Sequence, residues 1–160
     1  MASATARRGR SRAAFLPAKG WSVFWSPLPW GDDGNDEAQV IWATNGPVLG
    51  DDAETGWPIN TVTQLPSDGI VVCATMAPEF EDGPSIYPEA SIPLRLDSGM
   101  FFTGQYENQA ALNVSLYRVA AHVKDQYITA DVYFGVPNPG AAMKQAAAAQ
   151  LSRLVLKAAD

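Results

Sequence analysis

Cysteine and histidine each occur once in the chain, as Cys73 and His122. A thiolate–imidazole pair would need the two side chains adjacent in the fold, with a third group that orients the imidazole. The sequence offers no such group, and Cys73 lies in an apolar run, where a thiol is a buried and unactivated core residue. We therefore interpret Cys73 as core and His122 as an exposed or half-exposed strand residue near the end of a hairpin. A single cysteine also excludes an internal disulfide and a cysteine-rich zinc site.

Acidic side chains suggest two further kinds of chemistry. Asp33, Asn35 and Glu37 alternate as at the start of a calcium-binding loop, but no glycine occupies the sixth place of that loop, so we interpret them as a solvated turn. Carboxylates in residues 51–54 and 79–82 could pair for glycoside hydrolysis, which requires a separation that no sequence specifies. An enzyme that uses acidic loop residues is one hypothesis for the function.

All five tryptophans lie before residue 60: Trp21, Trp25, Trp30, Trp42 and Trp57. Indole rings exposed beside acidic groups can form a carbohydrate-binding platform, whereas tryptophan in an alternating strand is more often core. Trp30 follows a proline-rich strand end and Trp57 ends an acidic loop, so these two are the candidate ligand-binding residues of a second hypothesis, a small-ligand or carbohydrate-binding domain. Phosphate-binding, hydrolase and zinc-protease motifs are absent, and we expect no cofactor and no metal.

Charge is distributed unevenly along the chain, whose formal net charge is −6. Residues 1–20 hold five of the eleven basic residues and no acid, whereas residues 21–94 hold twelve of the seventeen acids and no Lys or Arg. An acidic body repels polyanions, so nucleic acid is not the expected partner. Blocks of like charge are often interaction tails. The predicted partner-binding residues are therefore four arginines of the first block, Arg7, Arg8, Arg10 and Arg12.

The length of 160 residues fits one domain. We predict a basic, flexible N-terminal arm over residues 1–16 and a single α+β domain over residues 17–160. No apolar run approaches the roughly 18 residues that a membrane-spanning helix needs. The basic start is followed by no apolar signal-peptide core, which predicts a cytoplasmic location.

The clearest predicted elements lie in residues 112–156. Residues 112–123 and 126–134 are rich in β-branched and aromatic residues and predict two strands, joined by a two-residue loop at Lys124 and Asp125 or by a longer one. One pairing register of these two strands gives the hairpin an apolar face and a polar face, and we prefer it for that reason. It pairs Tyr117 with Val132, Val119 with Ala130, Ala121 with Ile128 and Val123 with Gln126 on one face, and Arg118 with Asp131, Ala120 with Thr129 and His122 with Tyr127 on the other.

A helix is predicted after this hairpin, with Asn138 as its N-cap and Pro139 as its first residue. One apolar stripe follows from spacings of four, four and three residues, with Lys144 off the stripe. The stripe consists of Met143, Ala147, Leu151 and Leu154. Residues 154–156 are predicted as either the last helical turn or a short final strand.

In the first half, strands are predicted at residues 21–25, 38–44, 70–76 and 91–96, with residues 100–102 able to pair back. The run 70–76 has no polar alternation, which predicts a central strand covered on both faces.

The fold class expected from these elements is α+β, a mostly antiparallel sheet of about six strands with one C-terminal helix packed on one face. The first hypothesis for the function is a non-catalytic protein-interaction or accessory domain that engages a protein partner through the basic arm, the acidic loops or both. The sequence indicates no oligomeric state.

Overall fold

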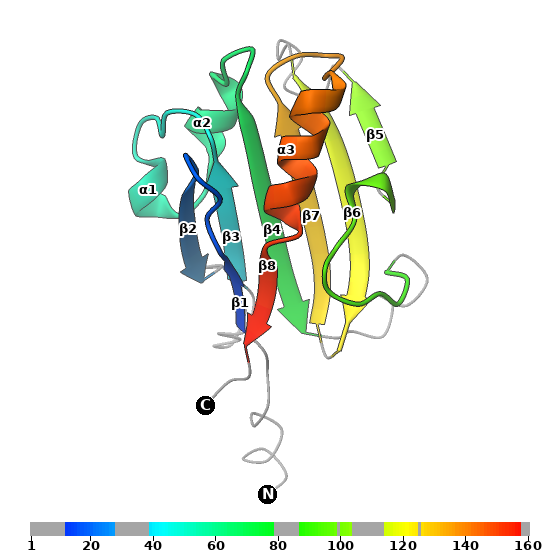
Figure 1. Cartoon of the computed structure of the whole chain (residues 1–160). Coiled ribbons are helices and arrows are strands. Elements are labelled where there is room, and N and C mark those ends of the chain that lie inside the picture. Colours follow the sequence, from blue (N-terminus) through cyan, green and yellow to red (C-terminus); the bar gives the residue numbers. More distant parts are fainter. Residues whose placement is uncertain are drawn as a thin grey trace, which may run out of the picture.

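The computed structural model describes residues 12–27, 39–78, 87–98, 100–103, 114–124 and 126–157. These residues form two antiparallel sheets (Figure 1). The main sheet has six strands in the order β2-β3-β4-β7-β6-β5, and a separate two-stranded ribbon pairs β1 with β8. The α+β class and the mostly antiparallel sheet of six strands are confirmed.

The elements have the following bounds. The ribbon consists of β1 (Arg12–Phe15) and β8 (Leu154–Lys157). The main sheet consists of β2 (Ser22–Pro27), β3 (Gln39–Thr44), β4 (Ile70–Pro78), β5 (Met100–Thr103), β6 (Ser115–Val123) and β7 (Gln126–Phe134). The helices are α1 (Asp52–Thr55), α2 (Ile59–Thr63), the 3₁₀ helix η2 (Leu96–Ser98) and α3 (Ala141–Leu151).

The β6–β7 hairpin adopts the predicted register in every pair, from Ser115 opposite Phe134 to Val123 opposite Gln126. The two-residue loop is confirmed because β6 ends at Val123 and β7 begins at Gln126. Lys124 takes a φ of 57°, the left-handed conformation that tight hairpin loops need. On the polar face Arg118 forms a bidentate pair with Asp131, with Nε 2.7 Å from Oδ1.

Strand β4 lies at the centre of the sheet, between β3 and β7. Val71 and Val72 point to opposite faces and are both fully buried, so the prediction of a strand covered on both faces is confirmed. The face seen in Figure 1, called the front face here, is covered by α3, by the β1–β8 ribbon and by residues 92–96.

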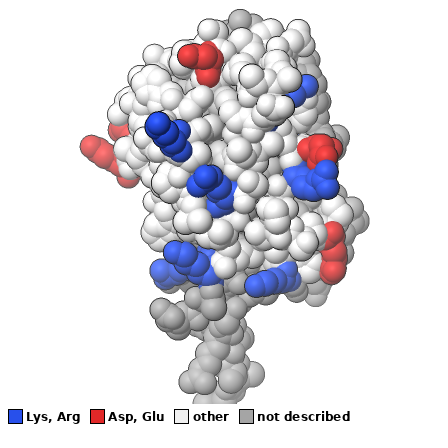
Figure 2. Space-filling view, in the orientation of Figure 1, with Lys and Arg blue, Asp and Glu red and all other residues white. Residues whose placement is uncertain are grey.

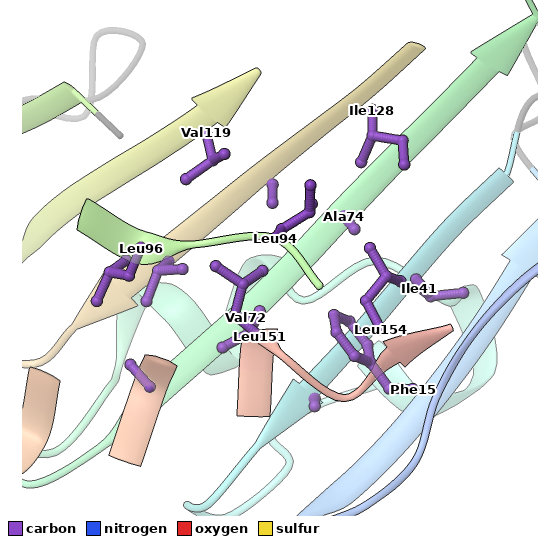
Figure 3. Close-up of a cluster of buried hydrophobic side chains, with 14 of the residues drawn as sticks. Phe15, Ile41, Val72, Ala74, Leu94, Leu96, Val119, Ile128, Leu151 and Leu154 are labelled. Carbon is purple, nitrogen blue, oxygen red and sulfur yellow. The ribbon is translucent and has the colours of Figure 1, made fainter. Parts of the chain in front are cut away.

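One hydrophobic cluster joins the front of the sheet to these covering elements (Figure 3). Ala147, Leu151 and Leu154 are fully buried in it, and Met143 packs against its margin, which confirms the predicted apolar stripe. Burying a leucine side chain contributes about 2 kcal/mol. The C-terminal helix therefore packs on one face of the sheet, as expected.

Both ends of α3 differ from the prediction in detail. Its N-cap is Gly140, which has an extended backbone and makes no side-chain cap hydrogen bond. Asn138 is exposed two residues earlier, in a bend, and does not cap the helix. At the other end, a turn at residues 152–153 separates the helix from residues 154–157, which form a strand because the ribbon partner β1 is available to pair with them.

Two predictions for the first half are wrong. Residues 50–58, expected as a loop, contain the short helix α1, and α2 follows it. Residues 91–96, expected as a strand, form no strand; Pro93 lacks an amide donor, and Leu94 and Leu96 both bury their side chains on the front face instead. Strand β5 pairs with β6 rather than back onto that segment.

The last part of the predicted flexible arm, residues 12–16, belongs to the folded structure instead. Residues 12–15 form β1, and Ala13 and Phe15 are buried in the front cluster. Their alternation with Arg12 and Ala14 gives the strand one apolar side, which is the physical reason that it packs. Residues 1–11 lie outside the described residues.

The backbone of Pro66 lies so close to Gly135 that no side chain fits at this position. The Gly135 N–H donates to the Gly69 carbonyl at 3.0 Å, and a Cβ there would overlap the backbone oxygen of Pro66. We predict that Gly135→Ala lowers the free energy of unfolding by about 3 kcal/mol, because backbone cannot move aside as a side chain can. Gly140→Ala is the control, since a Cβ there meets nothing within 4 Å and a lost glycine cap costs at most about 1 kcal/mol. Urea denaturation measures both, and equal losses would contradict the packing described.

Candidate functional site

The outer surface of the β1–β8 ribbon is basic. Arg12 lies directly opposite Lys157, and the register extends to Leu16, whose N–H donates to the Arg153 carbonyl at 3.1 Å. Side chains two residues apart share one side of a strand, so Arg153 and Lys157 point outward together with Arg12. Like charges that face each other across strands are destabilising by a few tenths to about 1 kcal/mol. The ribbon therefore carries a local electrostatic cost.

We name Arg12, Lys124, Arg153 and Lys157 the basic face. Figure 2 shows Lys and Arg side chains spread over the front and present at its lower end, with acidic side chains toward the margins. Arg153 Nη1 donates to the Pro17 carbonyl at 3.3 Å, a contact that leaves its charge without a counterion. Within the described parts of the chain, the ion pairs are Arg95–Asp97 and Arg118–Asp131, and His122 contacts Glu89. None of these contacts includes a residue of the basic face.

Gln150 fixes the ribbon to the end of α3. Its side chain is fully buried, accepts a hydrogen bond from the Ala18 N–H at 2.9 Å and donates one to the Leu16 carbonyl at 3.0 Å. This side chain thus satisfies the Leu16 carbonyl and the Ala18 N–H just beyond β1. The basic residues of both ribbon strands are held on a rigid support.

An upper hollow of about 540 Å³ lies beside the basic face, between α3 and residues 93–97. Leu94, Leu96 and Ala148 give it an apolar lining, together with the half-buried ring of Tyr117. The ammonium group of Lys144 lies 5.7 Å from the centre of that ring, a cation–π distance. The hollow is thus apolar inside and cationic at its margin.

A lower hollow of about 410 Å³ lies between β8 and residues 90–92, above the β6–β7 turn. Its lining includes Ile92, Val123, Val155 and Leu156, with Lys124 from the basic face. Residues 90–97 form one wall of both hollows, while α3 and β8 form the other. The two hollows therefore follow each other along the same pair of walls, and we name them together the front groove.

The predicted partner-binding arginines are only partly described. Arg12 belongs to the basic face, whereas Arg7, Arg8 and Arg10 lie outside the described residues. Sequence reasoning did not identify Lys124, Arg153 and Lys157 as their companions. Arg153 and Lys157 share one face in a helix as well as in a strand. The missing signal was the pairing of residues 154–157 with residues 12–15, which places Lys157 opposite Arg12.

The tryptophans that the structure describes do not gather at one site. Trp42 is fully buried and stacks on Phe24 with ring centres 4.3 Å apart. Trp25 is 52% exposed and donates from Nε1 to Gln39 Oε1 at 2.8 Å, and Trp57 is 37% exposed after α1. Neither exposed indole lines the upper or the lower hollow. Trp30 lies outside the described residues.

Cys73 and His122 are far apart. Cys73 in β4 lies opposite Asp131 in β7, which lies opposite Arg118 in β6. His122 is four residues further along β6 than Arg118. Two strand spacings across the sheet and four residues along it separate the Cα atoms of Cys73 and His122 by ~16 Å. Burial, followed by the charge of Asp131, raises the pKa of the Cys73 thiol far above its ordinary value. The thiol is thus neutral and buried, as predicted. His122 is half-buried beside Tyr127, and its Nδ1 lies 3.5 Å from Glu89 Oε1.

Asp52 is the one acid of residues 51–54 that is buried, and its carboxylate has a structural role. Oδ2 accepts hydrogen bonds from the N–H and the hydroxyl of Thr61, both at 2.6 Å, and Oδ1 accepts one from the Asn60 N–H at 3.2 Å. The carboxylate thus caps the first turn of α2, where backbone N–H groups have no helical partner. This engagement removes Asp52 from the acids that could act on a substrate.

Two other predicted acidic sites, residues 33–37 and residues 79–82, fall outside the described residues. Among the residues with assigned positions, no three His, Cys, Asp or Glu side chains gather as a metal site would require. In the same part of the chain, every helix is too short or too polar to cross a membrane.

The chain matches no family model, and no curated protein or solved structure is similar to it. The function is therefore inferred from the basic face and the two hollows on the front of the molecule.

Replacing Asp52 by alanine tests its structural role. Asp52→Ala leaves the amides of residues 60 and 61 without an acceptor in a buried position, so we predict a loss of about 3 kcal/mol in the free energy of unfolding. Glu54→Ala is the matched control, because Glu54 is exposed on the same short helix. Thermal and urea unfolding measure the effect, and a loss no larger for Asp52→Ala than for the control would contradict this role.

Proposed function

We propose that this protein is a non-catalytic interaction domain that binds an acidic surface of a partner protein through the basic face. The observation that carries the proposal is charge segregation: Arg12, Arg153 and Lys157 share the outer surface of the ribbon in a chain whose net charge is −6. A net-acidic protein repels polyanions at long range, so a local basic face favours a partner that is acidic only in part.

An acidic partner also relieves the repulsion between the basic side chains of the ribbon. The repulsion between Arg12 and Lys157 is relieved when a carboxylate lies between them, so binding recovers a cost that the free protein carries. Arg7, Arg8 and Arg10 precede β1 directly in the sequence, and we propose that they also bind the partner. A cytoplasmic location remains a prediction from the sequence.

The basic face supports this function better than the two alternatives. Trp25 and Trp57 lie on separate elements and line neither hollow, which weakens the carbohydrate-binding hypothesis. Asp52 is engaged by α2, which weakens the hypothesis of an enzyme that uses acidic loop residues. Neither observation bears on Trp30 or residues 79–82.

A short poly-L-glutamate, long enough to cover the basic face but not the acidic parts of the surface, is the probe, because attraction by the face then acts over the short range that screening allows. We predict that the protein binds it despite its own net charge, and that affinity falls as salt is raised, because exposed charges are screened within about 8 Å at physiological ionic strength. The triple variant Arg12→Gln, Arg153→Gln, Lys157→Gln should lose at least about tenfold in affinity, measured by fluorescence anisotropy.

A charge-matched control separates the face from the net charge. The control variant has the same net charge as the triple variant, but its three changes lie at exposed positions outside the basic face. They are Ala53→Glu, Gln64→Glu and Ser67→Glu. This control should bind within about twofold of the natural chain. No binding by the natural chain, or equal binding by both variants, would overturn the proposal. Tighter binding of a DNA duplex than of poly-L-glutamate would replace the protein partner by a nucleic acid.

A further inference from the structure

Among the described residues, one backbone edge of strand β8 has no strand partner, and this edge lies beside the front groove. The Leu16 N–H to Arg153 carbonyl bond sets the alternation of the ribbon, so residues 153, 155 and 157 direct their backbone groups toward β1. Leu154 and Leu156 then direct their N–H and C=O groups to the opposite edge. That edge faces the lower hollow, whose other wall is residues 90–92, and within the described ranges no backbone hydrogen bond joins β8 to that wall.

Resting on the proposed function, we infer that the partner presents an extended acidic segment that lies in the front groove and adds to the free edge of β8 as a third strand. Addition of a strand to an exposed edge gives affinity through backbone hydrogen bonds and specificity through alternate side chains. The backbone groups of Leu156 are the main pairing site, because Leu156 is only partly buried whereas Leu154 is fully buried.

The groove specifies which side chains the segment carries. Side chains on one face of a strand are spaced about 7 Å apart, and those that face the protein enter the two hollows. The lower hollow presents Ile92, Val123 and Leu156, and the upper hollow presents Leu94, Leu96 and Tyr117. Both linings fit apolar side chains, so apolar residues alternate in the segment with residues that face solvent.

Charge selects acids for the alternate positions. Lys124 stands at the lower end of the groove and Lys144 at its upper end. Arg95 adds no net charge, because its guanidinium is paired in a bidentate manner with Asp97 at 2.7 and 3.1 Å. The segment that fits is therefore one in which apolar residues alternate with Asp or Glu.

A second copy of this chain fits the edge less well than such a segment. Two β8 strands pairing antiparallel would place the basic side chains Arg153 and Lys157 of one copy against those of the other, and like charges directly opposite are destabilising. An acidic strand meets no such cost.

The probe is a labelled heptapeptide of alternating leucine and glutamate with blocked ends. We predict that it binds the full chain at least about tenfold more tightly than the same peptide with alternate amides N-methylated, because N-methylation removes strand pairing and keeps the charge. Binding should slow hydrogen exchange at the Leu156 amide by at least about tenfold, measured by NMR. A peptide of the same composition, with its leucines in one block and its glutamates in another, controls for charge and hydrophobicity. We call it the block peptide.

Filling the groove separates this inference from the proposed function. Ala148→Phe fills the upper hollow, and Ser91→Phe, at an exposed position, fills the lower one with little cost to the fold. Each should weaken the heptapeptide about tenfold while poly-L-glutamate affinity stays within about twofold.

The outcomes distinguish the two proposals. The groove inference would be overturned if the alternating, N-methylated and block peptides bound with equal affinity. It would also be overturned if hydrogen exchange at the Leu156 amide did not change. In either case, poly-L-glutamate binding would continue to support the basic face. Loss of poly-L-glutamate binding by the natural chain would overturn the proposed function itself. Sedimentation of the free chain as a dimer, with Leu156 already protected, would assign the edge to a second copy instead.

Discussion

Antiparallel pairing of β1 with β8 joins the first described residues of the chain to the last, and the front of the molecule depends on it. Closing so long a loop costs conformational entropy, although that cost grows only slowly with loop length. Burial of Ala13, Phe15 and Leu154 in the front cluster offsets it, and the Gln150 side chain secures the backbone beyond β1. Without this pairing the sheet would lose part of its cover, and the basic side chains would have no common surface.

The dimensions of the sheet explain why a groove remains. Six strands at about 4.8 Å spacing span roughly 24 Å, whereas a helix with its side chains is about 10 Å wide, so α3 cannot cover the front face alone. The ribbon covers one side and residues 92–96 cover the other through Leu94 and Leu96. The front groove is the junction between these separate covering pieces. The proposed partner-binding site thus lies at this junction, on a scaffold whose strands are paired.

The sequence predicts the parts of this fold that local pattern determines. The hairpin register follows from the agreement of its two faces, and the central position of β4 follows from an uninterrupted apolar run. The ribbon could not be predicted, because nothing local reveals that residues 12–15 find a partner at residues 154–157. Assigning Arg12 to a flexible arm hid its proximity to Lys157, so only one member of the basic face was identified as such. Leu94 and Leu96 resemble strand residues in sequence, yet only tertiary packing determines that they cover the sheet instead of joining it.

Amide hydrogen exchange of the free chain, followed by NMR, tests the central claim most directly. The ribbon pairs Ala14 with Val155 through their backbone groups, so these two amides should exchange at least about a hundredfold more slowly than in an unstructured peptide, while Leu156, on the free edge, exchanges faster than either. Unprotected amides at both Ala14 and Val155 would contradict the account, since the basic face and the groove wall would then lack the strand pair that forms them.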